Sequence, residues 1–142
     1  MDKLIHTAKI RVRYVETDKM GVVNNGNYLT YFEVGRTELM RSFNMPYSAL
    51  EDHGFYFPLL ESHAEYIKTA NYDDVLTIKT VLSTTLSARV RFDYSIFRGD
   101  DLLTRGYTIH CFMDINSMHA TRPPRLFSDF LRKYADTPSI VL

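Results

Sequence analysis

The sequence contains a single cysteine, no excess of charge of either sign and no long hydrophobic run. One cysteine, Cys111, excludes an internal disulfide and a cysteine-rich metal cluster, and it favours a reducing compartment. Seventeen basic residues balance seventeen acidic ones, and neither sign forms a block, so the sequence gives no sign of nucleic-acid or anionic-membrane binding. No apolar run approaches the roughly 20 residues of a membrane span, and the N-terminus does not resemble a signal peptide. We therefore expect a soluble, cytoplasmic protein.

The five histidines are also uninformative about metal chemistry. No two of them have the spacing of a metal-binding pair on a helix, and none lies in a nucleophile motif. The sequence therefore predicts neither a metal site nor a cofactor.

Length and composition are those of one globular domain. The chain has 142 residues, of which 45% are hydrophobic and 24% charged. A chain of this size buries roughly two-thirds of its unfolded surface, which suffices for a hydrophobic core. No repeat or low-complexity linker divides it, so we expect residues 1–142 to form a single domain.

The N-terminal part predicts a strand followed by a loop. Apolar and basic residues alternate from residue 9 to Tyr14, as in a strand with one buried face. The alternation stops in residues 15–26, where glycine and asparagine favour turns. Asn27 is a good N-cap for the helix expected next.

Apolar residues at steps of three or four then predict an amphipathic helix over residues 28–43. Gly35 lies on its apolar stripe, where it would allow close approach to a sheet. A short second helix is expected over residues 46–53.

Four segments rich in β-branched and aromatic residues follow, at about 59–69, 75–84, 89–98 and 102–116. The polar turns at 71–74 and 98–101 favour antiparallel hairpins, so we expect a meander. A final amphipathic helix follows Pro123-Pro124. The predicted class is α+β, and the uncovered sheet surface and edges favour self-association.

The segment from Asp18 to Tyr28 is the best candidate for chemistry. It places a carboxylate before a glycine-containing turn and the start of a helix. Free N–H groups at a helix start stabilise a negative carbonyl oxygen, and a nearby carboxylate can attack the carbon or activate water. This arrangement suits acyl transfer; the alternative is that Asp18 forms an Asx-turn and Asn27 is merely a cap.

Several segments together resemble the hotdog-fold thioesterases of the 4-hydroxybenzoyl-CoA thioesterase and YbgC type. The resemblance runs through residues 11–18, 21–23, 27–28, 31–38, 70–78, 110–114 and 122–124, and thus spans nearly the whole chain. It implies a hotdog fold, in which an antiparallel five-stranded sheet wraps a long helix, and it implies homodimers or homotetramers.

The same resemblance implies hydrolysis of an acyl-CoA thioester between two protomers, with Asp18 as nucleophile or general base. Backbone N–H groups around Asn25 and Gly26 would hold the thioester oxygen. Members of the family have histidine or tyrosine where this chain has Asn25, and asparagine cannot act as an acid or base near neutral pH. Tyr14 matches a tyrosine close to the site and could orient Asp18, or it could be an inward core residue.

Candidate substrate-binding residues fall into two groups. An acyl pocket could be lined by Met20, Val23, Tyr28 and Phe57. The phosphates of CoA require cations, and the candidates are Arg89 and Arg91, two apart on a predicted strand, together with Arg122 and Arg125. Each of these arginines could equally be an ordinary surface residue.

Other functions remain open on the sequence. The absence of histidine from residues 7–52 disfavours a hydratase or dehydratase. A non-catalytic protein that binds acyl-CoA or an acyl carrier protein is the main alternative, because Asn25 could mark lost activity. The sequence does not identify the acyl group, and an acyl carrier protein could replace CoA as the thioester carrier.

Overall fold

The computed structural model of the chain describes residues 2–135. Its strands are β1 (Lys3–Arg11), β2 (Phe55–Tyr56), β3 (Leu59–Tyr66), β4 (Val75–Ser83), β5 (Val90–Arg98), β6 (Asp101–His110), β7 (Phe112–Asp114) and β8 (Ala120–Thr121). Its helices are α1 (Gly26–Ser42), α2 (Tyr47–Asp52) and α3 (Arg125–Ala135), and a short 3-10 helix, η1, spans Tyr14–Glu16. The predicted α+β class is confirmed.

The five long strands form one antiparallel sheet in the order β1-β4-β5-β6-β3, and β2, β7 and β8 form a small second sheet. The hairpin predicted at residues 98–101 is present between β5 and β6. The hairpin predicted at residues 71–74 is wrong, because β3 pairs with β6 and leaves β4 to pair with β1 and β5. The chain therefore crosses from one sheet edge past two strands, and β3 stays at the edge.

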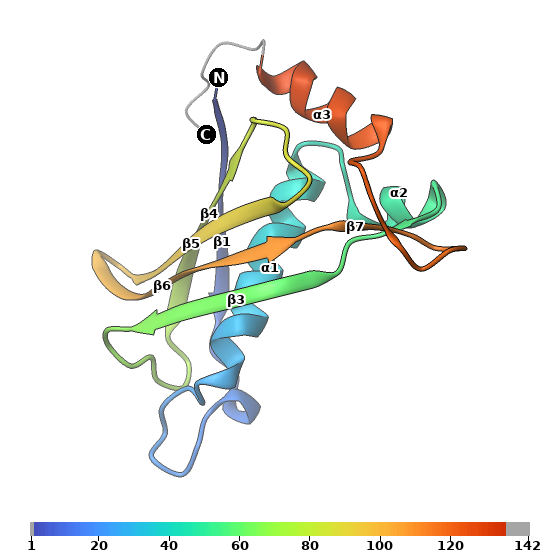
Figure 1. Cartoon of the computed structure of the whole chain (residues 1–142). Coiled ribbons are helices and arrows are strands. Elements are labelled where there is room, and N and C mark those ends of the chain that lie inside the picture. Colours follow the sequence, from blue (N-terminus) through green and yellow to red (C-terminus); the bar gives the residue numbers. More distant parts are fainter. Residues whose placement is uncertain (1, 136–142) are drawn as a thin grey trace.

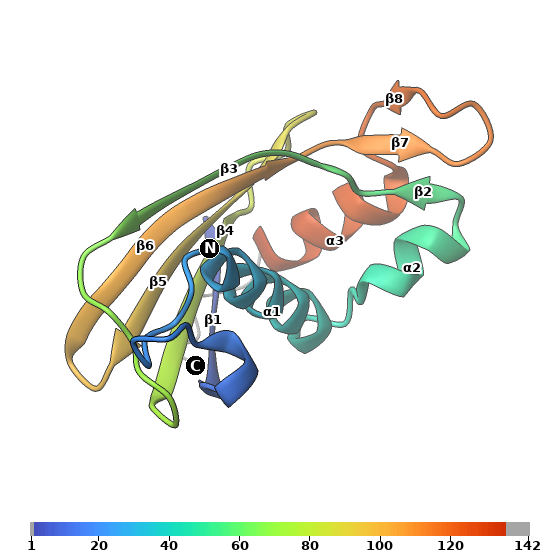
Figure 2. The same ribbon diagram turned by 90° about the horizontal axis from the view of Figure 1, so that it is seen from below.

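Helix α1 lies against the concave face of the large sheet, and the sheet curves around it (Figures 1 and 2). The buried residues of β4 and β5 alternate along each strand, as expected for a sheet with one face in the core. Phe32 of α1 stacks on Tyr94 of β5, with ring centroids 4.4 Å apart. The core is therefore the layer between α1 and the central strands.

Gly35 explains how the helix approaches the sheet so closely. A Cβ atom at this position would lie 2.4 Å from Thr80 Oγ1 and 2.9 Å from Ile78 Cγ2, both on β4. Any larger residue would push α1 away from the sheet. The close approach predicted from Gly35 is confirmed.

Three local predictions are wrong. Strand β1 ends at Arg11, so Tyr14 lies in η1 with 78% of its surface exposed and is not an inward core residue. Helix α1 begins at Gly26, so Asn27 is already inside it and is not its cap. Arg89 precedes β5 and does not share a strand face with Arg91.

Within residues 2–135, no helix has both the length and the apolar character that are needed to cross a membrane.

The glycine at position 35 can be tested by a double-mutant cycle. We expect Gly35→Ala to lower the free energy of unfolding by about 1–3 kcal/mol, because the added methyl overpacks the contact with β4. Thr80→Ala removes the nearest atom, a hydroxyl without a hydrogen-bond partner among the described residues, so the cost of Gly35→Ala should fall in that background. Denaturant unfolding of the four proteins measures both terms. Equal costs of Gly35→Ala in the two backgrounds would contradict this packing account.

Candidate active site

The loop between β1 and α1 is held by a buried glutamate. The side chain of Glu16 is 9% exposed, and its Oε1 accepts hydrogen bonds from the Arg13 backbone N–H and the Tyr31 hydroxyl, each 2.9 Å long. Its Oε2 accepts one from Arg13 Nε, also at 2.9 Å. The Glu16 carbonyl accepts hydrogen bonds from Asn24 N at 2.9 Å and Asn27 Nδ2 at 2.8 Å. One residue thus ties the loop to its own beginning and to helix α1.

These contacts set the charge state of Glu16. Burial raises its pKa, but the hydrogen bonds from Arg13 and Tyr31 and the charge of Arg13 outweigh burial. The pKa of Glu16 therefore lies below its ordinary value of 4.5, and the group is ionised near neutral pH. Burial first, and then the hydrogen bond to the Glu16 carboxylate and its charge, raise the pKa of Tyr31 well above its ordinary value.

Asp18 lies two residues further along this loop. Its Oδ1 accepts a hydrogen bond of 2.8 Å from the Met20 backbone N–H, so the Asx-turn considered above is present. Its backbone N–H donates to Val22 O at 2.9 Å, which closes a small turn around Gly21. Within residues 2–135, its second oxygen has no hydrogen-bond partner and is available to a ligand.

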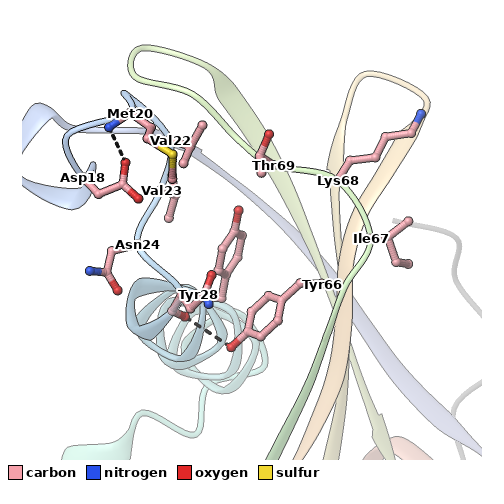
Figure 3. A pocket seen from close by; sticks show the side chains of 11 residues that line it. Asp18, Met20, Val22, Val23, Asn24, Tyr28, Tyr66, Ile67, Lys68 and Thr69 are labelled. Carbon is pink, nitrogen blue, oxygen red and sulfur yellow. Dashed lines mark hydrogen bonds between the residues drawn. The ribbon is translucent and has the colours of Figure 1, made fainter.

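Asp18 borders a cavity of about 430 Å³. On one side lie Asp18, Met20 and Val23 of the loop, and on the other lies the segment from Tyr66 to Thr69 that follows β3 (Figure 3). Tyr28 and Asn25, at the start of α1, also line the cavity. The cavity therefore joins the carboxylate to a helix N-terminus, as the sequence suggested.

The helix start offers one free backbone donor. The Gly26 N–H donates to Asn24 Oδ1 at 3.2 Å, whereas the Asn25 N–H has no partner among the described residues. The Asn25 carbonyl accepts a hydrogen bond of 3.4 Å from the Tyr66 hydroxyl. Of the two donors predicted, the Gly26 N–H is thus occupied by Asn24, and the Asn25 N–H is left without a partner within residues 2–135.

The remaining predicted residues lie elsewhere in the protomer. Tyr14 contacts Tyr72, with ring centroids 5.7 Å apart, and does not line the cavity. Phe57 stacks on His110 at the other end of β3. Arg91 pairs with Asp93 and covers the ring of Tyr107. Arg89 lies in a hollow beside Phe127 and Leu131 of α3, Arg122 lies in the segment that precedes α3, and neither lines the Asp18 cavity.

The sequence does not point to Tyr66 and Lys68 as residues of the site. The strand predicted to run to residue 69 ends at Tyr66, so Tyr66 is the last residue of β3 and Lys68 follows it. Lys68 is the cation that lines the cavity, and it pairs with Asp101 at 3.3 Å. The signal that could have identified this segment is its position just before the polar turn at 71–74.

Comparison with known proteins shows the family of this chain. Residues 12–134 match the model of the thioesterase-like superfamily. The chain belongs to this superfamily. A putative esterase of Aquifex aeolicus is 38% identical over 101 residues, which cover 71% of this chain and 79% of the relative. The acyl-CoA thioesterase YbgC of Haemophilus influenzae is 29% identical over 117 residues, which cover 82% and 86%.

Solved structures agree with the sequence matches. A DHNA-CoA thioesterase from Staphylococcus aureus superposes with a TM-score of 0.85 at 30% identity, covering 92% of this chain and 89% of that one. The predicted hotdog fold and the resemblance to YbgC-type thioesterases are thereby confirmed. The protein is a thioester hydrolase.

Glu16 provides a test of how the loop is held. We expect Glu16→Gln to lower the free energy of unfolding by about 1–3 kcal/mol near pH 7, because it weakens hydrogen bonds to a buried charge. The pKa of Glu16 is lower in the folded state, so its stabilisation is present above pH 4.5 and is lost as the pH falls through the folded-state pKa. The difference between wild type and variant should therefore shrink below about pH 4.5 in denaturant unfolding.

A matched control is Glu38→Gln, which removes an exposed carboxylate paired with Arg41 on α1. Exposed pairs contribute at most about 1 kcal/mol, so this variant should resemble wild type. A Glu16→Gln difference that stayed constant down to pH 3 would show that the charge of Glu16 does not anchor the loop.

Proposed function

We propose that the protein hydrolyses acyl-CoA thioesters and that Asp18 is the nucleophile or the general base. The observation that carries this proposal is the free carboxylate oxygen of Asp18, which borders the same cavity as the free N–H of Asn25. A thioester carbonyl between them would have its oxygen on the helix N-terminus and its carbon toward the carboxylate. The acyl-CoA thioesterase activity of YbgC, a relative, supports the choice of substrate.

Both roles of Asp18 give a balanced reaction. As a nucleophile, its free oxygen bonds to the thioester carbon, the carbon–sulfur bond breaks, and CoA leaves as a thiolate. Water then cleaves the resulting anhydride, which releases the acid and restores the carboxylate. As a general base, Asp18 instead takes a proton from the water that attacks the same carbon; the carbon–sulfur bond then breaks, and the proton passes from Asp18 to the sulfur of the departing CoA.

The active form is proposed to be a homodimer built on strand β3. This strand is at the sheet edge, and it exposes Leu59, Leu60 and Tyr66 by 47–50% each. An exposed edge with apolar residues is a template for pairing with another strand. Antiparallel pairing of β3 with its copy about a two-fold axis would cover this edge in both protomers.

Such a dimer would bring the predicted phosphate-binding arginines of one protomer toward the Asp18 end of its partner. Arg89 precedes Val90, which pairs with His110, and His110 pairs with Leu59 at the start of β3. Arg89 therefore lies at the opposite end of the sheet from Tyr66 and Asp18. Because antiparallel pairing places the start of one β3 beside the end of the other, Arg89 and Arg122 remain our candidates to hold the phosphates of a CoA molecule bound by the partner.

The single cysteine of the chain favours a reducing compartment, so we propose that the protein is located in the cytoplasm.

The central prediction is that Asp18→Asn abolishes turnover while the fold is kept. Wild type should release free thiol from at least one member of a panel of aliphatic and aryl CoA thioesters. Asp18→Asn should reduce kcat/KM roughly 100- to 10,000-fold, since the amide can neither attack nor accept a proton. Thiol release with a chromogenic reagent measures the rates, and circular dichroism checks the fold.

The matched control is Asp73→Asn, which removes an exposed carboxylate that pairs with Arg11. Asparagine tolerates the positive φ of 70° at that position, so this variant should keep wild-type activity. Equal turnover by wild type and Asp18→Asn would remove Asp18 from its proposed role. Turnover of acyl carrier protein thioesters alone would change the carrier, and tight acyl-CoA binding without any turnover would favour a binding protein.

The quaternary structure gives a separate prediction. Light scattering should report at least twice the 16.6 kDa of one chain. Leu60→Lys, which places a charge on the exposed edge strand, should shift the protein toward monomers and reduce activity in parallel. A fully active monomer would contradict the proposed dimeric site.

A further inference from the structure

A second cavity, of about 490 Å³, lies at the other end of β3 from Asp18. Its walls come from the middle of α1 (Arg36), from α2 (Tyr47) and from the ends of the sheet strands (Leu59, His110). Leu59 begins β3 and Tyr66 ends it, so the two cavities are separated by the length of this strand, about 24 Å at 3.4 Å per residue. Within one protomer they are independent sites.

His110 is an unusual wall for such a cavity. The residue is 1% exposed, and its ring stacks on Phe57 with centroids 4.7 Å apart. Nε2 lies 3.0 Å from Thr108 Oγ1, whereas Nδ1 has no hydrogen-bond partner among the described residues. Burial, and secondarily the charge of Arg36, lower the pKa of His110 to about 4, although a hydrogen-bonding interaction with the Phe57 backbone opposes the shift. The ring is therefore neutral near pH 7, and within the described residues no hydrogen bond of full geometry holds Nδ1.

Two neighbouring hydroxyl groups bear on which ring nitrogen carries the proton. The hydroxyls of Tyr94 and Thr108 lie 2.5 Å apart, and Thr108 Oγ1 lies 3.0 Å from Nε2 of His110. If Tyr94 donates to Thr108, the Thr108 hydroxyl donates to Nε2 and the proton of the neutral ring is on Nδ1. In that order Arg36 and His110 are both hydrogen-bond donors at one cavity, which Glu33 also lines.

The proposed dimer connects this cavity to the reaction. If β3 pairs antiparallel with its copy about its centre, Leu59 of one protomer lies beside Tyr66 of the other. Tyr66 lines the Asp18 cavity, and Leu59 lines the His110 cavity. The two-fold axis therefore brings the His110 cavity of one protomer next to the Asp18 cavity of its partner.

We propose that the His110 cavity binds an oxygen acceptor at the far end of the acyl group whose thioester is held at Asp18 of the partner subunit. The inference rests on the function proposed above. Nδ1–H of His110 and the Arg36 guanidinium donate to that oxygen, and Phe57 and Tyr47 provide aromatic walls for the carbon skeleton. A ketone or hydroxyl and a carboxylate share this acceptor chemistry. An acyl group without such an oxygen gains neither of these hydrogen bonds.

The test compares three thioesters of similar length. Hexanoyl-CoA has no distal oxygen, 5-oxohexanoyl-CoA has a neutral acceptor, and glutaryl-CoA has an anionic one. We expect wild type to prefer at least one oxygenated substrate over hexanoyl-CoA by about tenfold or more in kcat/KM, and the two arms identify which kind. His110→Phe, which keeps the ring stacked on Phe57, should abolish that preference by slowing only the oxygenated substrate.

Two further variants make the result specific. Arg36→Met should reduce the preference, most strongly for glutaryl-CoA, whereas Arg41→Met removes the same charge from an exposed position on α1 and should leave it unchanged. Melting temperatures check that each variant folds. No preference in wild type, or a preference that survives both His110→Phe and Arg36→Met, would overturn the inference.

A binding measurement separates this inference from the proposed function. Free 5-oxohexanoate and glutarate are titrated into the protein while the histidine ring nitrogens are followed by NMR, with the His110 signals assigned by their loss in His110→Phe. A shift of Nδ1 without turnover of any thioester would support the cavity and reject the thioesterase. Turnover of thioesters without a shift of Nδ1 and without a preference for oxygenated substrates would support the thioesterase function and reject the proposed role of the His110 cavity.

Discussion

The candidate site depends on a carboxylate that does no chemistry. Glu16 is buried between the loop and α1, where an ionised group is stable only because hydrogen bonds from Arg13 and Tyr31 replace its water. Its carbonyl holds Asn24 and Asn27 at the start of α1. The position of Asp18 relative to the helix N-terminus is therefore set by Glu16, two residues away, and an exposed loop acquires the order that a reacting group requires.

The helix and the edge strand then determine how far apart the functional groups lie. Gly35 lets α1 lie so close to β4 that even an added Cβ atom would overlap Thr80. Helix α1 contributes to both cavities, through Asn25 at its start and Arg36 in its third turn, and β3 contributes Tyr66 and Leu59. Two rigid elements thus carry both sites, and rigid elements hold a site more closely than loops do.

Local patterns in the sequence predicted most elements but not how they assemble. Alternation and helical spacing are properties of neighbouring residues, and they located α1, α2, α3 and the long strands. The order of the strands is a long-range property. The turn at residues 71–74 looks like a hairpin, yet β3 pairs with β6, and the segment between β3 and β4 forms backbone hydrogen bonds with Val12, Val23 and Leu103. Tyr14 failed for a related reason, since alternation continues into η1 after the hydrogen bonds of β1 have ended.

The same distinction applies to the site. Asp18 and the helix start lie close in sequence, so their spacing and the family resemblance identified them together. Tyr66 and Lys68 reach the cavity from 48 and 50 positions further along the chain, and His110 becomes informative only once its buried, unpaired Nδ1 is seen beside Arg36. In the proposed dimer, a site divided between the two ends of this edge strand would be complete only when the strand meets its copy. Thioester cleavage and recognition of the acyl end would then reside in different protomers, so the acyl specificity could change through His110 and Arg36 without disturbing Asp18.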